Sequence, residues 1–463
     1  MMTLEKHASK PKSGFVTENN MAMLTDLYQL TMNASYSHHN KNETVTFDLF
    51  YRKLPRNRGY MLAAGLEQVL HYLENLSFSE DDIDYLGSQD LFRKEFLETL
   101  RDFKFTGDVY AMPEGTPVFP NEPIIRITAP RMEAQLVETF LLNAVNFQTM
   151  IASKASRVVE SADGRAVTDF GLRRAHSADA GMKASRACYI AGCVGTSNVL
   201  AGKEFGISII GTMAHAYVMS FDSELEAFRA YASTFKDKSV LLIDTYDTLE
   251  GAKNAAIVAK ELEREGYSLK GVRLDSGDLC ELSKGVRKIL DDAGLDYVKI
   301  VASNDLNEYK IKELIGQGAC IDSFGVGTEM VTSKDAPAMS GVYKLVEDCD
   351  KEGNAVPRIK LAEGKITLPG KKQVYRLYDE NGKCLKDIIA LHDEEVEGEP
   401  LLKKVMENGA VCYGIPRLSE IRNHAQDGVG KISKDVKSGA EYKVELSPKL
   451  EKLVEDLKEK YRR

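Results

Sequence analysis

Residues 271–278 read GVRLDSGD, a short β-rich run that ends abruptly in polar residues. Six further runs have the same form: AVTDFG (166–171), CVGTSN (193–198), IIGTMAH (209–215), VLLIDTYD (240–247), KIVASND (299–305) and FGVGTE (324–329). Most of them precede a helical pattern, and a strand followed by a helix at intervals of about thirty residues is typical of βαβ units. So many units in succession predict an irregular (β/α) barrel-like domain of the α/β class, with an open doubly wound sheet as the alternative.

Regions of different character flank these repeats. We interpret the chain as a flexible tail (1–19), an N-terminal α+β domain (20–160), the barrel-like domain (161–345) and a C-terminal lobe with a terminal helix (346–463). Apolar periodicity in the α+β domain predicts helices over 21–38 and 132–157, with strands at 43–54, 107–115 and 123–130. Ser447 and Pro448 form a helix-start signal for an amphipathic helix at the C-terminal end.

Composition limits the class of protein. The 463 residues are 43% hydrophobic and 28% charged, which is ordinary globular composition, and the formal net charge is -9. Because nucleic acids and anionic membranes bind basic surfaces, neither is expected as a partner. The seven scattered cysteines show no CxxC pair and suggest reduced thiols. No apolar stretch reaches the roughly 18 residues of a membrane span, so we expect a cytoplasmic protein.

Polar residues mark the ends of the predicted strands: Asp169, His215, Asp244, Asp247, Arg273, Asp275, Asp278 and Asn304. In parallel barrels ligand chemistry gathers at the carboxyl ends of the strands. The aspartates suit a Mg²⁺-bound pyrophosphate or a developing sugar cation, although single aspartates there often cap helices. A neutral His215 could act as a base or accept a phosphoryl group, and a structural histidine is the alternative.

Two other motifs point to anionic ligands. In FGVGTEMVTS (324–333), Gly325 and Gly327 precede Thr328, where exposed backbone N–H groups at a helix start would bind phosphate; a plain strand-to-helix turn is the alternative. After Phe170, the pair Arg173 and Arg174 could bind a carboxylate or phosphate in a protein that is negative overall.

These motifs also resemble a known family. The segments LTDLYQLTM, FYRKLPRNRGY, PEGTPVFPNEPIIRI, NFQTMIASKASR, DFGLRRAHS, GTSNV, GTMAHA, LIDTYDT, RLDSGD, SFGVGTEMVTS and PGKKQVYRLYD resemble the nicotinate phosphoribosyltransferases in order and spacing, from about residue 21 to about residue 379. The resemblance implies the type II phosphoribosyltransferase fold and a homodimer with shared active sites. It further implies condensation of nicotinate with phosphoribosyl pyrophosphate, with Mg²⁺ required and ATP hydrolysis coupled, as the first step of NAD salvage from nicotinate.

The resemblance also implies roles for single residues. His215 is similar to the histidine that ATP phosphorylates, and Asp275 and Asp244 to carboxylates near the ribose and pyrophosphate. Among the implied substrate-binding residues, Phe170 and the partner subunit's Tyr28 would stack on the two faces of the nicotinate ring. Arg173 and Arg273 would bind the nicotinate carboxylate and the substrate phosphates. Ser197 and Thr212 complete the implied substrate-binding set. The implied phosphate-binding residues are Ser303, Asn304, Gly325, Gly327 and Thr328, together with Arg52 from the partner chain. The metal ligands are not assigned.

One position separates close relatives. Enzymes acting on nicotinamide are similar to this chain but carry aspartate where GTSNV has Ser197, and a carboxylate there would repel nicotinate. Met213 stands where some relatives have a second histidine. The alternatives are a nicotinamide or quinolinate phosphoribosyltransferase, the latter decarboxylating and independent of ATP, or a catalytically silent phosphosugar-binding relative.

Overall fold

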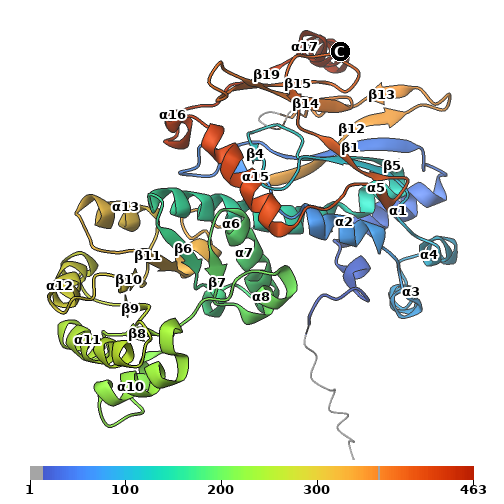
Figure 1. The fold of residues 1–463 in the computed structure, drawn as a ribbon. Helices are drawn as coiled ribbons and strands as arrows, with labels where there is room; N and C mark the ends of the chain where they lie inside the picture. Colours follow the sequence, from blue (N-terminus) through green and yellow to red (C-terminus); the bar gives the residue numbers. More distant parts are fainter. Residues whose placement is uncertain (1–13, 363–364, 366, 463) are drawn as a thin grey trace, which may run out of the picture.

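The computed structural model describes residues 14–362, 365 and 367–462 of the chain. Of the predicted tail, residues 1–19, the first thirteen lie outside the described residues. Figure 1 shows a parallel sheet with its helices on one side of the molecule and a group of largely antiparallel sheets on the other. The long helix α6 (Glu138–Ser161) packs on elements of both groups and joins them.

Six of the seven repeated runs form strands of one parallel sheet, whereas the run at 209–215 was wrongly predicted as a strand and forms only a single bridge, between Ile209 and Thr196. In spatial order the six strands are β7 (Gly195–Thr196), β6 (Ala166–Asp169), β11 (Ser323–Val326), β10 (Lys299–Ala302), β9 (Gly271–Leu274) and β8 (Val240–Leu242). Apart from the β6–β11 pair, every pair of neighbours is also consecutive in sequence. This is the cyclic order of a barrel opened between β7 and β8, whereas a doubly wound sheet reverses its order at a switch point. The irregular barrel-like fold is therefore confirmed.

Helices connect these strands and surround the curled sheet. They are η2 (Leu172–Arg174), α7 (Ala178–Ile190), α8 (Val199–Phe205), α9 (His215–Val218), α10 (Glu224–Phe235), η3 (Lys236–Lys238), α11 (Thr248–Arg264), α12 (Leu279–Asp292), α13 (Glu308–Gly316) and α14 (Thr328–Val331). Asp247, Asp278 and Asn307 accept backbone N–H bonds at the starts of α11, α12 and α13. Two of the strand-end aspartates are therefore helix caps.

A seven-stranded antiparallel sheet takes strands from both halves of the chain. Its order is β13 (Ala355–Pro357), β12 (Gly341–Cys349), β1 (Thr44–Tyr51), β5 (Ile125–Pro130), β3 (Asp108–Ala111), β17 (Lys403–Glu407) and β18 (Ala410–Val411). A four-stranded sheet contains β16 (Glu399–Pro400), β14 (Lys372–Tyr378), β15 (Cys384–Leu391) and β19 (Val444–Leu446), and β2 (Met61–Leu62) pairs with β4 (Pro117–Val118). The domain boundaries stay an interpretation, and the shared sheet ties the first region to the last.

The remaining helices cover these sheets. They are η1 (Met21–Met23), α1 (Leu27–His38), α2 (Leu66–Glu74), α3 (Glu80–Gly87), α4 (Lys94–Arg101), α5 (Arg131–Leu136), α15 (Leu418–Lys431), α16 (Lys434–Lys437) and α17 (Pro448–Arg462). The helix predicted over 21–38 is interrupted before α1, and that predicted over 132–157 is divided at Val137. At the C-terminal end, Ser447 Oγ accepts the Leu450 N–H at 3.2 Å, as an N-cap should.

None of the helices in the described ranges combines the length and apolar character of a bilayer-crossing segment.

Candidate active site at the carboxyl edge of the open barrel

One cavity of about 660 Å³ opens at the carboxyl ends of the parallel strands. It is lined by Phe170, Arg173, Arg174, Ser197, Gly211, Thr212, Met213, Ala214, His215, Arg273, Asp275, Ser303, Asn304, Asp305, Gly325, Gly327 and Thr328. Most of the sequence-predicted site residues are in this set, because parallel strands that end at one edge bring their following residues together.

His215 and Asp275 face each other in the cavity. His215 begins α9, and its Nδ1 lies 3.1 Å from Thr245 Oγ1. Its Nε2 lies 4.0 Å from Asp275 Oδ2, and the two side chains are 39% and 38% exposed. Because the contact with Thr245 orients the ring through Nδ1, Nε2 is the nitrogen left for a reactant.

Asp275 is held in place from two sides. Its Oδ1 accepts a short hydrogen bond from Ser303 Oγ. Its backbone N–H donates to Asp244 Oδ2 at 2.8 Å, and Ser276 Oγ donates to the same oxygen at 2.6 Å. Asp244 is buried and is not a lining residue, so within this chain it orders the turn that carries Asp275. Asp244 Oδ1 has no hydrogen-bond partner among the described residues.

Arg273 supplies positive charge from β9. Its guanidinium donates to Thr212 Oγ1 and, at 3.2 Å, to the Met213 carbonyl. Burial lowers the pKa of Arg273, although the nearby Asp275 and Asp244 act in the opposite direction. Arg173 stands exposed on η2 at the cavity rim. The two guanidinium groups line the cavity and place two positive charges in its wall.

Two strand-to-helix turns form a cradle of backbone groups. The first follows β10, where Asn304 and Asp305 have φ angles of 97° and 40°, in a region that L-residues seldom adopt. The second follows β11 and contains Gly327. Within β11, an added Cβ on Gly325 would come 2.4 Å from the Phe170 ring, so glycine there makes room for that ring at the cavity.

A buried carboxylate supports the aromatic side of the cavity. Asp169, at the end of β6, accepts from Thr196 Oγ1 at 2.7 Å, Ser185 Oγ at 2.9 Å and the Gly171 N–H at 2.9 Å. These bonds fix the segments that carry Phe170 and Ser197. Asp169 is 1% exposed and thus acts on the cavity through its neighbours.

Tyr28 and Arg52 lie outside this cavity within the chain. Tyr28 is on α1, 47% exposed, and lines a separate depression together with Asn146 and Phe147. Arg52 follows β1, with its guanidinium 5.5 Å from the Phe50 ring centroid. Their assignment to a partner subunit's site stays a prediction.

Sequence reasoning gave no role to two residues that the fold brings in. Asp305 lines the cavity, and Thr245 orients His215. Each lies inside a quoted strand-end motif, next to a residue that was singled out, so weighing every polar residue of those motifs would have included them.

No group of three or more His, Cys, Asp or Glu side chains gathers as metal ligands in the described part of the chain. The oxygens nearest to such a role are those of Asp275 and the unbonded Oδ1 of buried Asp244.

An open parallel barrel with charged, half-exposed side chains around one cavity at its carboxyl edge is the arrangement of an α/β-barrel enzyme. Three family models match the chain: the nicotinate phosphoribosyltransferase N-terminal domain over residues 23–146, the nicotinate phosphoribosyltransferase family over 165–351 and its C-terminal domain over 395–454. The chain belongs to the nicotinate phosphoribosyltransferase family.

Individual relatives agree over nearly the whole length. A nicotinate phosphoribosyltransferase of Mycobacterium tuberculosis is 45% identical over 434 residues, covering 93% of this chain and 92% of the relative. That of Bacillus subtilis is 42% identical over 461 residues, covering 93% and 94%. The crystal structure of human nicotinic acid phosphoribosyltransferase superposes with a TM-score of 0.83 at 30% identity, covering 94% of this chain and 99% of the human one.

Proposed function

We propose that this chain is an ATP-dependent nicotinate phosphoribosyltransferase. It would join nicotinate to phosphoribosyl pyrophosphate, giving nicotinate mononucleotide and pyrophosphate while ATP is hydrolysed to ADP and phosphate, the first step of NAD salvage from nicotinate. The observation that carries the proposal is one cavity, in a member of this family, that unites His215, Asp275 and Arg273 with the backbone cradle of two strand-to-helix turns.

The base would lie at the aromatic end of the cavity. Phe170 offers a flat face for a pyridine ring, and Arg173 and Arg273 are the nearby cations that suit its carboxylate. Ser197 is a neutral side chain on this wall and does not repel the negatively charged carboxylate of nicotinate. For the amide of nicotinamide, it offers no strong hydrogen-bond acceptor.

The sugar would lie between the base and the two turns of the cradle. Ser303, Asn304, Gly325, Gly327 and Thr328 would bind its 5′-phosphate. Asp275, at the centre, would stabilise the positive charge that develops on the ribose as its bond to pyrophosphate breaks. Thr212 would contact the ligand beside Arg273.

Mg²⁺ suits the carboxylates of Asp275 and Asp244. Magnesium takes few protein carboxylates and retains several waters, and Asp244 Oδ1 is a buried oxygen without a bond among the described residues. When bound, the ion would neutralise the negative charge of the pyrophosphate leaving group.

His215 would carry the link to ATP. Its free Nε2 would attack the γ-phosphorus of ATP, forming the N–P bond while the P–O bond to ADP breaks. The phosphohistidine, later hydrolysed to free phosphate, would raise affinity for the phosphosugar and favour catalysis.

A homodimer would complete the site. Tyr28 is half-exposed and Arg52 is only partly buried, so part of each side chain is open to a second chain. The partner subunit's Tyr28 would cover the open face of the base, and the partner's Arg52 would reach the phosphate.

The test is formation of nucleotide from labelled nicotinate and phosphoribosyl pyrophosphate with Mg²⁺, with and without ATP, beside nicotinamide and quinolinate. Nicotinate mononucleotide that increases with ATP is expected. Product from nicotinamide alone, or from quinolinate without ATP, would give the activity to those alternatives. Phosphosugar binding with no product from any base would indicate a silent binding relative.

A further inference from the structure

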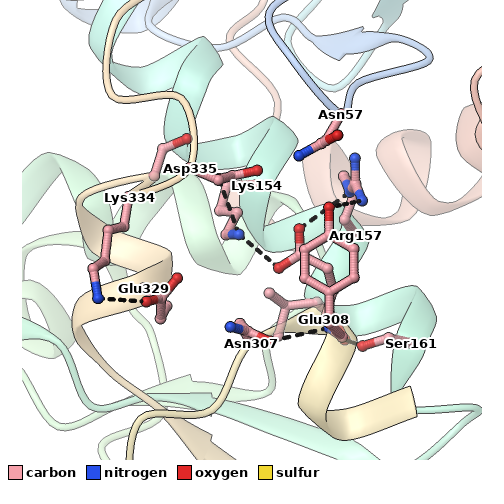
Figure 2. A network of polar contacts seen from close by, with 12 residues as sticks. Asn57, Lys154, Arg157, Ser161, Asn307, Glu308, Glu329, Lys334 and Asp335 are labelled. Carbon is pink, nitrogen blue, oxygen red and sulfur yellow. Dashed lines mark hydrogen bonds and ion pairs between the residues drawn. The ribbon is translucent and has the colours of Figure 1, made fainter. Parts of the chain in front are cut away.

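A buried lysine lies behind the phosphate-binding cradle. Lys154, on α6, is fully buried, and its Nζ lies 2.6 Å from Glu308 Oε2 and 3.0 Å from Asp335 Oδ1. Figure 2 shows Lys154, Glu308 and Asp335 on different parts of the chain, gathered at this contact. A buried ammonium is unfavourable unless carboxylates match its charge and accept its hydrogens, as these two do.

The two carboxylates lie just beyond the two turns of the cradle. Glu308 is the first residue of α13, shortly after Asn304 and Asp305. Asp335 lies beyond α14, the short helix that begins at Thr328 after the β11 turn. One ammonium with several donors, placed on α6, therefore ties together the two segments that continue from these turns.

Both tied segments contain unfavourable backbone. Besides Asn304 and Asp305, Ser333 has a φ of 43°. Non-glycine residues persist in this region when the surrounding structure holds them there, and such strain concentrates at ligand-binding segments. The ion pairs on Glu308 and Asp335 lie immediately beyond these residues and are the contacts placed to hold them.

Further cations complete the network. Arg58, from the β1–β2 connection, donates to both oxygens of Asp335 at 2.8 and 3.1 Å and to Ser333 Oγ at 2.9 Å. Burial alone would raise the pKa of Asp335. The hydrogen bonds and charges of Arg58 and Lys154 outweigh burial and bring this pKa well below its ordinary value. Arg157 Nε lies 3.3 Å from Glu308 Oε1 (Figure 2). Each carboxylate thus has two cationic neighbours, so neither repels an anion in the cradle as a free carboxylate would.

We propose that Lys154 is a positioning residue for the phosphosugar: through Glu308 and Asp335 it fixes the spacing of the two turns that receive the 5′-phosphate. This inference rests on the proposed function. Because Lys154 is fully buried, it acts on the ligand only through these turns. It should therefore govern affinity for phosphoribosyl pyrophosphate and leave the base site unaffected.

The test compares Lys154→Met with wild type. The KM for phosphoribosyl pyrophosphate, and its Kd measured by calorimetry without base, should rise about tenfold or more, since small displacements of a binding group are costly. The KM for nicotinate should stay within about twofold, because the aromatic end is held by Asp169. Unchanged KM and Kd for phosphoribosyl pyrophosphate in the folded variant would overturn the proposal.

Two further variants separate positioning from stability. Lys154→Met combined with Glu308→Gln also neutralises the carboxylate that has lost its nearer cation, so the melting temperature should recover while the KM for phosphoribosyl pyrophosphate stays raised. Recovery of both together would overturn the proposal. Lys372→Met is the matched control, because Lys372 is also buried and its Nζ lies 2.9 Å from Asp48 in the antiparallel region. It should lower the melting temperature without changing that KM.

The outcomes for wild type distinguish this inference from the proposed function. If wild type binds phosphoribosyl pyrophosphate but transfers it to no base, the proposed function fails, and the Kd comparison still decides the role of Lys154. If wild type does not bind phosphoribosyl pyrophosphate, both fail. Should Lys154→Met not fold, Glu308→Gln alone, which keeps the lysine paired with Asp335, must still raise the Kd.

Discussion

The barrel edge and the interior of the antiparallel region both contain charged residues, but these residues differ in how accessible they are to a ligand. In the antiparallel region, Arg376 binds Asp387 through Nε and Nη2, and Lys372 pairs with Asp48, with all four side chains almost completely buried. At the barrel edge, His215 is hydrogen-bonded through Nδ1 and Asp275 through Oδ1. The other polar atom of each side chain faces the cavity. A charged residue indicates chemistry where part of its bonding capacity remains available to a ligand.

The largest expected effect comes from Asp275, because its half-exposed carboxylate lines the cavity opposite His215. Asp275→Ala should lower turnover by about a hundredfold or more, as the loss of an electrostatic contact in the transition state typically does. Steady-state rates with saturating nicotinate and phosphoribosyl pyrophosphate would measure it. Turnover close to that of wild type would remove Asp275 from the catalytic assignment.

Next in size is the effect at His215. His215→Ala should abolish the stimulation by ATP while weak transfer remains, since Nε2 would no longer be present to accept a phosphoryl group. The ratio of rates with and without ATP is the measurement, and Thr245→Ala, which frees only Nδ1, is the milder comparison. An ATP ratio in His215→Ala equal to that of wild type would contradict the phosphohistidine.

A smaller change is expected at the wall of the cavity. Ser197→Asp should shift the preference between nicotinate and nicotinamide about tenfold or more toward the amide, because the added carboxylate repels one base and accepts from the other. The ratio of kcat/KM for the two bases would show it. Ser197→Asn, of similar size but uncharged, is the control, and equal ratios in all three proteins would refute the specificity argument.

No effect on activity is expected from a substitution of Glu122 in the antiparallel region. Glu122 is fully buried; burial and the adjacent Asp387 raise the pKa of Glu122 well above its ordinary value. A carboxyl with a raised pKa in the folded state stabilises below its unfolded pKa, and this contribution is lost as the pH rises through the folded pKa.

Glu122→Gln should therefore keep wild-type kinetics. As the pH rises above about 5, the free energy of unfolding of the variant should decline less steeply than that of wild type. The difference in slope should be up to about 1.4 kcal/mol per pH unit. Urea unfolding across this range would measure the slope. A slope identical to that of wild type would show that Glu122 titrates normally, and altered kinetics would break the contrast between the two regions.

Much of the candidate site could be predicted because parallel strands convert sequence position into spatial position. Residues directly after strands, such as Phe170, Asp275 and Ser303, meet at one edge whatever the details of packing. The same pattern also selected Asp247 and Asp278, which cap helices. Whether an acid faces the cavity or the helix start depends on the path of the turn, which the pattern of residue types does not specify.

The sequence by itself determined the repeated strand-helix units, the chemistry available at their ends and the family, because these reside in local order and residue type. Only the tertiary structure decided where the barrel stays open, that Asp244 acts through Asp275, and that Lys154 meets Glu308, 154 residues away along the chain. A contact between distant segments depends on how whole elements pack, and the periodicity of one segment does not specify which other segment it contacts.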